Sequence, residues 1–323
     1  MLVLFPEIRP YAEHTLSVEG PHKIHVEECG NPQGLPVLVC HGGPGCGTVP
    51  LQRRFFDPDC YRIILFDQRG CGKSTPHLET KLNTTQDIIN DMEAIRQFLK
   101  IDQWIVFGGS WGATLAMVYG IQHSDAVQAL LLRGTFLARQ KDFNWLYKEG
   151  GASRIFPEAW QDFIKPVLPE NQHDLVTAYS KKLRGPDELA RMSAAKTWAC
   201  WEAHLSTLRP NHVLVDQLCD PHTALSIALF ETHYFANNGF LEANYILDNM
   251  DKLQDIPGVL VHGRYDLVCP LDGAYEIQKA WPNAQLHVIR DAGHSASEPG
   301  IADALMRATR DFAQHFGDFN DHC

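Results

Sequence analysis

Hydrophobic residues in the first 135 positions fall into short runs that are separated by longer, mixed segments. The short runs are rich in β-branched and aliphatic residues, and each predicts a buried strand. They lie at residues 37–40, 62–66, 104–107 and 129–133. Residues 84–98 and 113–119 predict helices, and residues 15–28 predict a hairpin at a sheet edge. Strands that alternate with helices in this way predict a mostly parallel, doubly wound sheet.

The pattern changes at Phe136. From there to about Met250 the strand-like runs stop, and helical spacing with tryptophans and other bulky residues takes over. Strand-like runs return at 259–261 and 286–289, followed by a predicted helix at 301–316 and a frayed tail at 317–323. We therefore expect an α/β core made of residues 1–135 and 251–323. Residues 136–250 are expected to form a helical cap over the carboxyl ends of the strands.

Residues 104–120 combine a predicted strand, a glycine-rich turn and a predicted helix. The turn reads Gly108-Gly109-Ser110-Trp111-Gly112, which is a Gly-x-Ser-x-Gly pattern. In such a turn the glycines let strand and helix approach each other, and the strained serine exposes its hydroxyl near a helix N-terminus. The pattern also occurs in ordinary glycine-rich turns. Here the strand before it and the helix after it favour Ser110 as a nucleophile.

Two further segments fit this interpretation. A glycine-rich loop at 41–47 follows the strand at 37–40, and the amides of Gly43 and Trp111 are candidate donors to an oxyanion. The alternative is a flexible turn. Asp266 and His294 each follow a predicted strand, and the chain order serine, aspartate, histidine is the order of triads on this architecture.

The loop at 67–74 lies next to a predicted strand and carries several charged residues. Its glycines and Lys73 lack the spacing of a phosphate-binding loop, so that interpretation fails. We expect Asp67 and Arg69 to pair with each other and to fix this loop beside the glycine-rich loop at 41–47.

Composition and charge narrow the class of protein. With 323 residues, 45% hydrophobic and 21% charged, the chain has an ordinary globular composition. Its net charge of -11 argues against nucleic-acid and anionic-membrane partners, which select for basic patches. No stretch approaches the length of a membrane span, and the first residues lack the basic flank of a signal peptide.

Nine cysteines are scattered without a framework, so we expect free thiols in a reducing compartment and a cytoplasmic location. No group of histidines, cysteines and carboxylates has metal-ligand spacing. We therefore expect neither a metal nor another cofactor.

Two glutamates lie within apolar faces of predicted cap helices. On a helix over 189–205, Glu202 lies between tryptophans and alanines, and on a helix over 223–235, capped by Asp220, Glu231 lies among alanines and aromatics. A buried carboxylate costs several kcal/mol unless it is paired. A salt bridge is one explanation, but Arg191 lies about three turns from Glu202 along the helix. A cationic ligand is the other explanation.

Together these motifs resemble those of prolyl aminopeptidases (proline iminopeptidases), which are serine peptidases with the α/β-hydrolase fold. The similarity extends from about Glu13 to Phe316, and its motifs lie at residues 41–45, 67–72, 108–112, 262–266 and 293–294. The resemblance implies a serine aminopeptidase that releases N-terminal proline from peptides through a prolyl-enzyme intermediate.

The resemblance also implies roles for particular residues. Ser110, Asp266 and His294 would form the triad, and Gly43 and Trp111 the oxyanion hole. Glu202 and Glu231 would bind the substrate's free amino group, and Phe136 and Phe235 would wall the proline pocket. Cys46 is a departure, since related sequences often have glycine there.

Two alternatives stay open at this stage. A general esterase or amide hydrolase on the same fold would leave the two buried glutamates unexplained. A non-catalytic, hydrolase-like binding protein would leave the intact triad unexplained.

Overall fold

The computed structural model describes residues 2–317, and within them eight strands form one sheet in the order β1-β2-β4-β3-β5-β6-β7-β8. The strands are β1 (Ala12–Ser17), β2 (Lys23–Gly30), β3 (Leu35–Cys40), β4 (Tyr61–Phe66), β5 (Trp104–Gly109), β6 (Val127–Arg133), β7 (Gly258–Gly263) and β8 (Ala284–Ile289). β1 and β2 form an antiparallel hairpin at the edge, β2 pairs antiparallel with β4, and the remaining neighbours are parallel. The predicted hairpin and mostly parallel sheet are confirmed. The predicted tail lies outside the described residues apart from Gly317.

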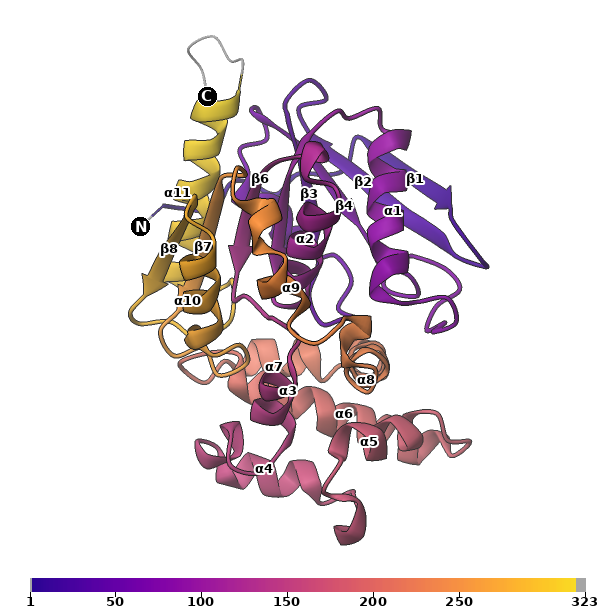
Figure 1. Ribbon diagram of the computed structural model, residues 1–323. Helices are drawn as coiled ribbons and strands as arrows, with labels where there is room; N and C mark the ends of the chain where they lie inside the picture. The colour runs from indigo at the N-terminus through magenta and orange to yellow at the C-terminus, as the bar shows by residue number, and fades with distance from the viewer. Residues whose placement is uncertain (1, 318–323) are drawn as a thin grey trace.

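Helices cover both faces of the sheet (Figure 1). Side chains of α1 (Thr85–Phe98), α2 (Trp111–Gln122) and α10 (Leu271–Ala280) belong to the larger apolar core, and those of α11 (Pro299–Phe316) to a smaller one. The short helix α9 (Tyr245–Asp248) packs near α2. Thr84 caps α1 by accepting a hydrogen bond from the Asp87 amide, which explains why the helix begins there.

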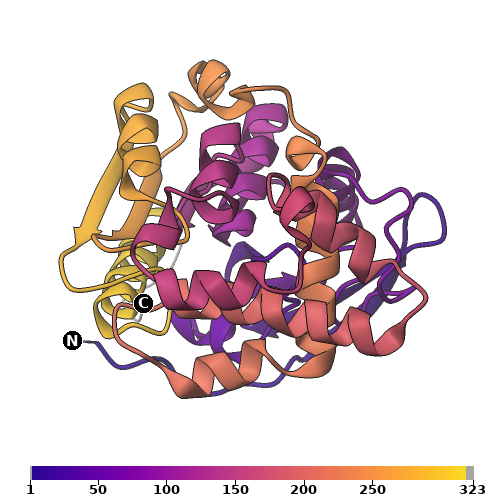
Figure 2. The ribbon, with the colours of Figure 1, turned by 90° about the horizontal axis from the view of Figure 1, so that it is seen from below.

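The chain between β6 and β7 is helical. It contains α3 (Gln140–Tyr147), α4 (Pro157–Ile164), α5 (Leu175–Leu183), α6 (Glu188–Leu205), α7 (His212–Leu218) and α8 (Pro221–Phe235). Figure 1 shows these helices below the sheet, and Figure 2 shows them from below, spread across it. All of them fall inside residues 136–250, while the exact limits of cap and core stay a prediction.

Hydrogen bonds join these helices to the loops at the carboxyl edge of the sheet. Ser226 Oγ on α8 donates to the carbonyl of Gly45 at 2.8 Å, and the His294 amide donates to the carbonyl of Ser206, just past α6, at 3.1 Å. The cap is therefore fixed directly to the loops that carry the predicted chemistry.

Two glycines allow the tight turn from β5 to α2. A Cβ at Gly108 would lie 2.1 Å from the carbonyl oxygen of Gly112, and a Cβ at Gly112 would lie 2.1 Å from that of Cys40. Both distances are far below van der Waals contact. Strand β5, strand β3 and helix α2 can therefore approach this closely only because both side chains are missing.

The expected pairing of Asp67 with Arg69 is wrong. Asp67 does not pair with Arg69; it accepts hydrogen bonds from the amides of Thr48 at 2.7 Å and Lys73 at 2.8 Å. Arg69 instead forms a two-pronged ion pair with Asp91 of α1, at 2.7 and 2.8 Å. Both residues lie beyond the end of β4, Asp67 in irregular backbone and Arg69 in a turn, so strand alternation does not set their directions and tertiary packing decides which partner each finds.

The cysteines are also not all free. Cys200 on α6 and Cys219 at the end of α7 form a disulfide, with Cα atoms 5.8 Å apart. The two helices bring together residues whose spacing along the chain carries no signal. Among the described residues, Cys29, Cys40, Cys46, Cys71 and Cys269 are free.

We expect Gly108→Ala to lower the stability of the fold by at least about 2 kcal/mol, because the added methyl group meets backbone that cannot rotate away. Gly273→Ala in α10 is the matched control: its Cβ would meet only ordinary contacts at 3.6 Å, so stability should hold or rise slightly. Urea denaturation of both variants measures the difference. Equal stability of the two variants would contradict this account of the turn.

Candidate active site

Ser110 lies at the junction of β5 and α2. Its backbone has φ 58° and ψ -123°, a conformation that costs free energy in a non-glycine residue. Its amide donates to the carbonyl of Arg133 at 2.9 Å, which fixes the turn against the end of β6. The side chain therefore stands at the carboxyl edge of the sheet, at the N-terminus of α2.

The glycine-rich loop lies against this serine. A Cβ at Gly42 would be 3.5 Å from the Cβ of Ser110, and Gly43 has φ +102° next to a cis peptide bond with Pro44. Gln68 holds the loop by donating from its amide to His41 Nε2 at 3.0 Å and from its side chain to the His41 carbonyl at 2.8 Å. The glycine-rich loop therefore lies directly beside the turn that carries Ser110.

Asp266 and His294 are in direct contact. His294 Nδ1 donates to Asp266 Oδ2 at 2.7 Å, and the amides of Val268 and Cys269 donate to Oδ1 at 3.0 and 2.8 Å. Burial by itself raises the pKa of Asp266, but the charge and hydrogen bond of His294 hold it below its usual value. Asp266 is therefore an ionised partner that fixes the proton on Nδ1.

The other ring nitrogen of His294 has an unexpected partner. Arg133 Nη1 lies 2.9 Å from His294 Nε2 and 3.0 Å from the His294 carbonyl oxygen. Ser110 instead interacts with the thiol of Cys269. Burial first, and then the charge of Arg133, lower the pKa of His294, against the opposing effect of Asp266.

The two cap glutamates are in contact with each other. Glu231 of α8 is 1% exposed, and its carboxyl group contacts that of Glu202 on α6. Trp198 Nε1 donates to Glu231 at 2.5 Å, and the Tyr147 hydroxyl donates to Glu202. No lysine, arginine or histidine among residues 2–317 lies within ion-pair distance of either carboxyl group. The salt-bridge explanation therefore fails for the described part of the chain.

Burial raises the pKa of both glutamates, and the charge of Glu202 raises that of Glu231 further, well above its usual value. Two acids in contact without a counterion favour a state in which they hold a proton. A ligand that supplies a positive charge would stabilise their ionised form.

An aromatic cluster adjoins the glutamates. Phe136 and Phe235 have ring centroids 5.9 Å apart, and Tyr147 stacks on Trp198 at 4.6 Å. Phe143 lies 5.1 Å from Phe235. The structure brings both predicted pocket phenylalanines together, and joins them to the glutamates through Tyr147 and Trp198.

Sequence reasoning missed four residues of this site: Tyr147, Trp198, Arg133 and Cys269. Trp198 could have been found, because it lies four residues before Glu202 on the same helix face. The other three come from segments that are distant in sequence, and no pattern marks them. Cys46 is exposed in the loop at 41–47, and the charges of Glu231, Glu202 and Arg133 act on it.

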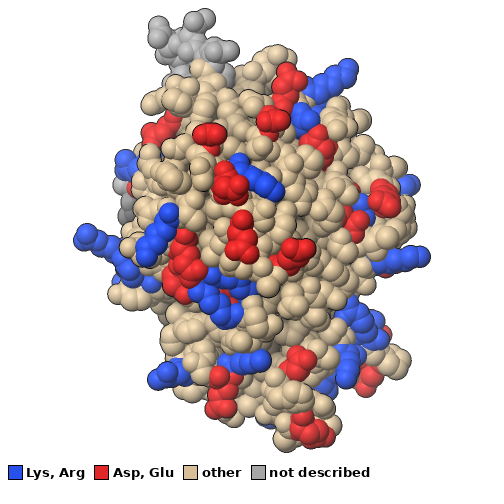
Figure 3. All heavy atoms as spheres, in the orientation of Figure 1, with Lys and Arg blue, Asp and Glu red and all other residues tan. Residues whose placement is uncertain are grey.

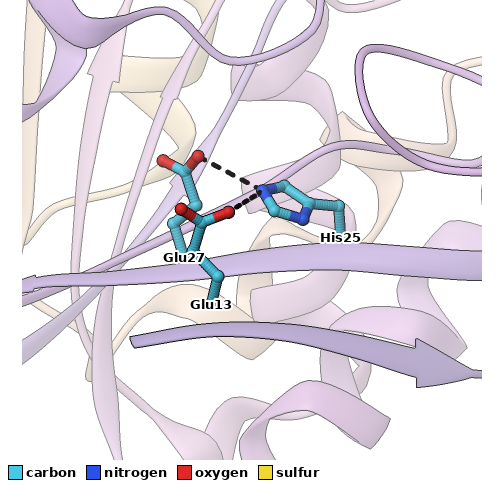
Figure 4. A group of neighbouring side chains, drawn as sticks. All are labelled: Glu13, His25 and Glu27. Carbon is cyan, nitrogen blue, oxygen red and sulfur yellow. Dashed lines mark hydrogen bonds and ion pairs between the residues drawn. The ribbon is translucent and has the colours of Figure 1, made fainter. Parts of the chain in front are cut away.

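A second group of ionisable side chains lies on the β1–β2 hairpin (Figure 4). His25 Nε2 lies 3.2 Å from Glu27 and 3.7 Å from Glu13. Lys73 Nζ lies 2.9 Å from Glu27, and Arg53 also pairs with Glu27. These cations already balance the two carboxylates, so we assign this group a structural role as an ion-pair network.

The surface carries no strong patch of one sign on the face shown in Figure 3, where acidic and basic side chains are interspersed. Within residues 2–317, none of the helices combines the length and apolar character that a membrane span requires.

Comparison with known proteins defines the class first. The family model of the alpha/beta hydrolase fold matches residues 36–300. A thermophilic esterase from Thermogutta terrifontis superposes with a TM-score of 0.64 at 18% identity, over 94% of this chain and 98% of that one. A putative aryl esterase from Burkholderia cenocepacia superposes with a TM-score of 0.63 at 16% identity, over 94% of this chain and 97% of that one. The predicted fold class is confirmed.

Closer relatives define the family. The proline iminopeptidase of Xanthomonas citri is 48% identical over 97% of this chain and 100% of its own length. The proline iminopeptidase of Arabidopsis thaliana is 48% identical over 94% of this chain and 80% of its own length. That of Neisseria gonorrhoeae is 46% identical over 94% of this chain and 96% of its own length. The chain therefore belongs to the proline iminopeptidase family, as its motifs predicted.

The raised pKa of Glu231 predicts how stability depends on pH. A carboxyl group whose pKa is higher in the folded protein contributes stability below its unfolded pKa, and loses it as pH rises through the folded value. The glutamine in Glu231→Gln does not titrate. The melting temperature of this variant minus that of wild type should therefore increase from about pH 5 to about pH 8. Thermal unfolding of both proteins across this range measures the trend.

Glu276→Gln is the control. Hydrogen bonds from Lys141 and Arg139 lower the pKa of this partly exposed group. Its replacement should therefore cost a little stability at the higher pH values, the opposite sign. A melting-temperature difference for Glu231→Gln that stays constant with pH would show that the glutamate is not held protonated.

Proposed function

We propose that this chain is a prolyl aminopeptidase, which releases an N-terminal proline from peptides through a prolyl-enzyme intermediate. The observation that carries the proposal is the contact of two buried carboxyl groups, with no cation near them among residues 2–317, next to an aromatic cluster. The His294–Asp266 pair and Ser110 at the strained turn after β5 support it. The activity named for relatives that match along their whole length supports it.

In the proposed mechanism Ser110 attacks the carbonyl carbon of the N-terminal proline. His294 takes the serine proton on Nε2 and later gives it to the leaving amine, while Asp266 stabilises the imidazolium through Nδ1. The amides of Gly43 and Trp111 are the proposed donors to the tetrahedral oxyanion. A water molecule then attacks the prolyl-enzyme, with His294 again as base. The proposed nucleophile, acid, base and oxyanion donors are all side chains or backbone amides of this chain.

The carboxyl pair explains why a free amino terminus would be required. A protonated amine placed between Glu202 and Glu231 replaces the proton that the pair holds, and the ring next to it packs against Phe136, Phe235 and Tyr147. Recognition of the amine fixes the distance from the chain end to Ser110. The enzyme then cleaves after one residue rather than within a peptide.

The proposed partners are peptides with a free N-terminal proline, and the family activity implies peptide substrates. A cytoplasmic location stays a prediction. The disulfide between Cys200 and Cys219 removes part of the argument that supported it.

A general esterase or amide hydrolase is the second candidate, because solved esterases share the fold. It leaves the two buried glutamates without a role. A binding protein without catalysis leaves the arrangement of Ser110, Asp266 and His294 without a role.

Ser110→Ala should lower turnover of prolyl amides by a factor on the order of a million, because triad members act as a unit. Steady-state kinetics with a chromogenic prolyl amide measures the loss, and the melting temperature shows whether the variant is folded. Retention of more than a few per cent of the activity in a folded variant would exclude Ser110 as the nucleophile.

A prolyl amide with an acetylated nitrogen should not be cleaved at a measurable rate, because it offers no cation to the carboxyl pair. Paired assays of the free and the acetylated substrate make the comparison. Glu202→Gln should lower kcat/KM for the free substrate about tenfold or more, the usual effect of losing a hydrogen bond to a charged group. Comparable cleavage of both substrates would instead favour the general hydrolase.

A further inference from the structure

Arg133 lies directly beside the nucleophile turn. It is the last residue of β6, it pairs with Gly109 across the sheet, and its carbonyl accepts the Ser110 amide at 2.9 Å. Its guanidinium lies against Gly109, where a Cβ would be only 2.3 Å from Nη2. The position before Ser110 therefore has room for this guanidinium because it is a glycine.

The contact with His294 involves the nitrogen that catalysis needs. Arg133 Nη1 lies 2.9 Å from Nε2 of His294, while Nδ1 donates to Asp266. In that tautomer Nε2 has a single lone pair, so it accepts a hydrogen bond from Arg133 or from Ser110 but not from both. The hydrogen bond from Arg133 to Nε2 must therefore be broken before Ser110 can give its proton to this nitrogen.

We infer that Arg133 is a positioning residue for the catalytic base: it caps His294 Nε2 in the resting enzyme and releases it when substrate fills the site. While engaged, it holds the imidazole neutral in the tautomer with the proton on Nδ1. This inference rests on the roles proposed above for Ser110, Asp266 and His294.

The charges around the imidazole support this role. His294 is faced by Asp266 and His262 from the β7 side and by Arg133 from β6. A proton on Nε2 would point at an N–H group of the guanidinium and would bring two positive charges into contact. The free enzyme therefore resists forming the imidazolium as long as Arg133 is engaged.

Arg133 is also held weakly enough to move. No carboxylate among residues 2–317 lies within ion-pair distance of it, and its Nε atom has no hydrogen-bond partner there. Its second bond, from Nη1 to the His294 carbonyl at 3.0 Å, offers a pivot. A rotation about that bond frees Nε2 for the serine proton and removes the charge that would oppose the imidazolium.

Arg133→Met tests the inference, because methionine keeps length and packing but neither charge nor donor. The acidic limb of kcat/KM reports the base in the free enzyme, and that of kcat reports the base in the complex. We expect the acidic limb of kcat/KM to lie about one pH unit higher in Arg133→Met than in wild type. At pH values well below this limb, kcat/KM of the variant should therefore be about tenfold lower than that of wild type. The kcat limb should stay in place, because Arg133 has already left Nε2 in the complex. A merely structural effect would not separate the two profiles.

Arg139→Met is the matched control, since Arg139 pairs with Asp142 and Glu276 and has no contact with His294. Its two limbs should match wild type. A second readout is the pH dependence of labelling by a fluorophosphonate, which reacts with a His-activated serine and carries no proline. It should show the same shift in Arg133→Met, independently of substrate specificity.

Each outcome decides something different. If the fluorophosphonate labels wild type but cleavage shows no preference for proline, the proposed substrate is wrong. The role of Arg133 is then decided by the pH dependence of labelling in wild type and Arg133→Met. If wild type is not labelled, the triad is wrong and this inference falls with it. Unshifted limbs in a folded Arg133→Met variant overturn the inference alone.

A measurement on wild type covers the case in which Arg133→Met does not fold. Nitrogen-15 NMR of the histidine rings reports which nitrogen of His294 carries the proton and at what pH the ring becomes charged. We expect the His294 ring to stay neutral, with its proton on Nδ1, down to a pH well below the range in which histidines ordinarily become charged. An imidazole that titrates like an exposed histidine would overturn the inference.

Discussion

The contact of β5, β3 and α2 at Gly108 and Gly112 is the constraint on which the site depends. Backbone meets backbone there at distances that no side chain would permit. The same approach fixes the strained backbone of Ser110 and sets the start of α2 against the glycine-rich loop. The strain follows directly on β5, in which every residue is buried, so the surrounding packing is able to hold it.

The cap contributes more than a lid over this edge. The carbonyl of Ser206, immediately after α6, accepts the amides of both His294 and Ser295, at 3.1 and 2.8 Å. The hydroxyl of the same serine donates to the carbonyl of Glu202 at 2.8 Å. One residue at the end of α6 therefore ties the backbone of Glu202, a proposed substrate-binding residue, to the backbone of the proposed base. A shift of α6 relative to the sheet would disturb binding and chemistry together.

Two ionisable groups in the site have no ion-pair partner among the described residues. One is the carboxyl pair of Glu202 and Glu231, and the other is the guanidinium of Arg133. Both are costly in a low-dielectric setting unless something compensates them. For the carboxyl pair, the compensating group is the substrate amine in the proposed function. For Arg133, it is the hydrogen bonds to His294. In the proposed function, binding of the amine compensates the carboxyl pair, and in the further inference the same binding event releases Arg133 from the base.

The sequence by itself determined the order of the elements, the elbow at Ser110, the following Asp266 and His294, and the two glutamates on apolar helix faces. These follow from short-range rules: strand and helix periodicity, and the need for glycine where backbones meet. Helix α8 begins at Pro221 with Asp220 as its cap, as expected, because capping is a local hydrogen bond. The tertiary structure alone decided the partners of side chains from distant segments. It paired Arg69 with Asp91, joined Cys200 to Cys219, and placed Tyr147 on Glu202 and Arg133 on His294. Such contacts depend on how helices and loops pack across the carboxyl edge of the sheet, and no spacing along the chain encodes that geometry.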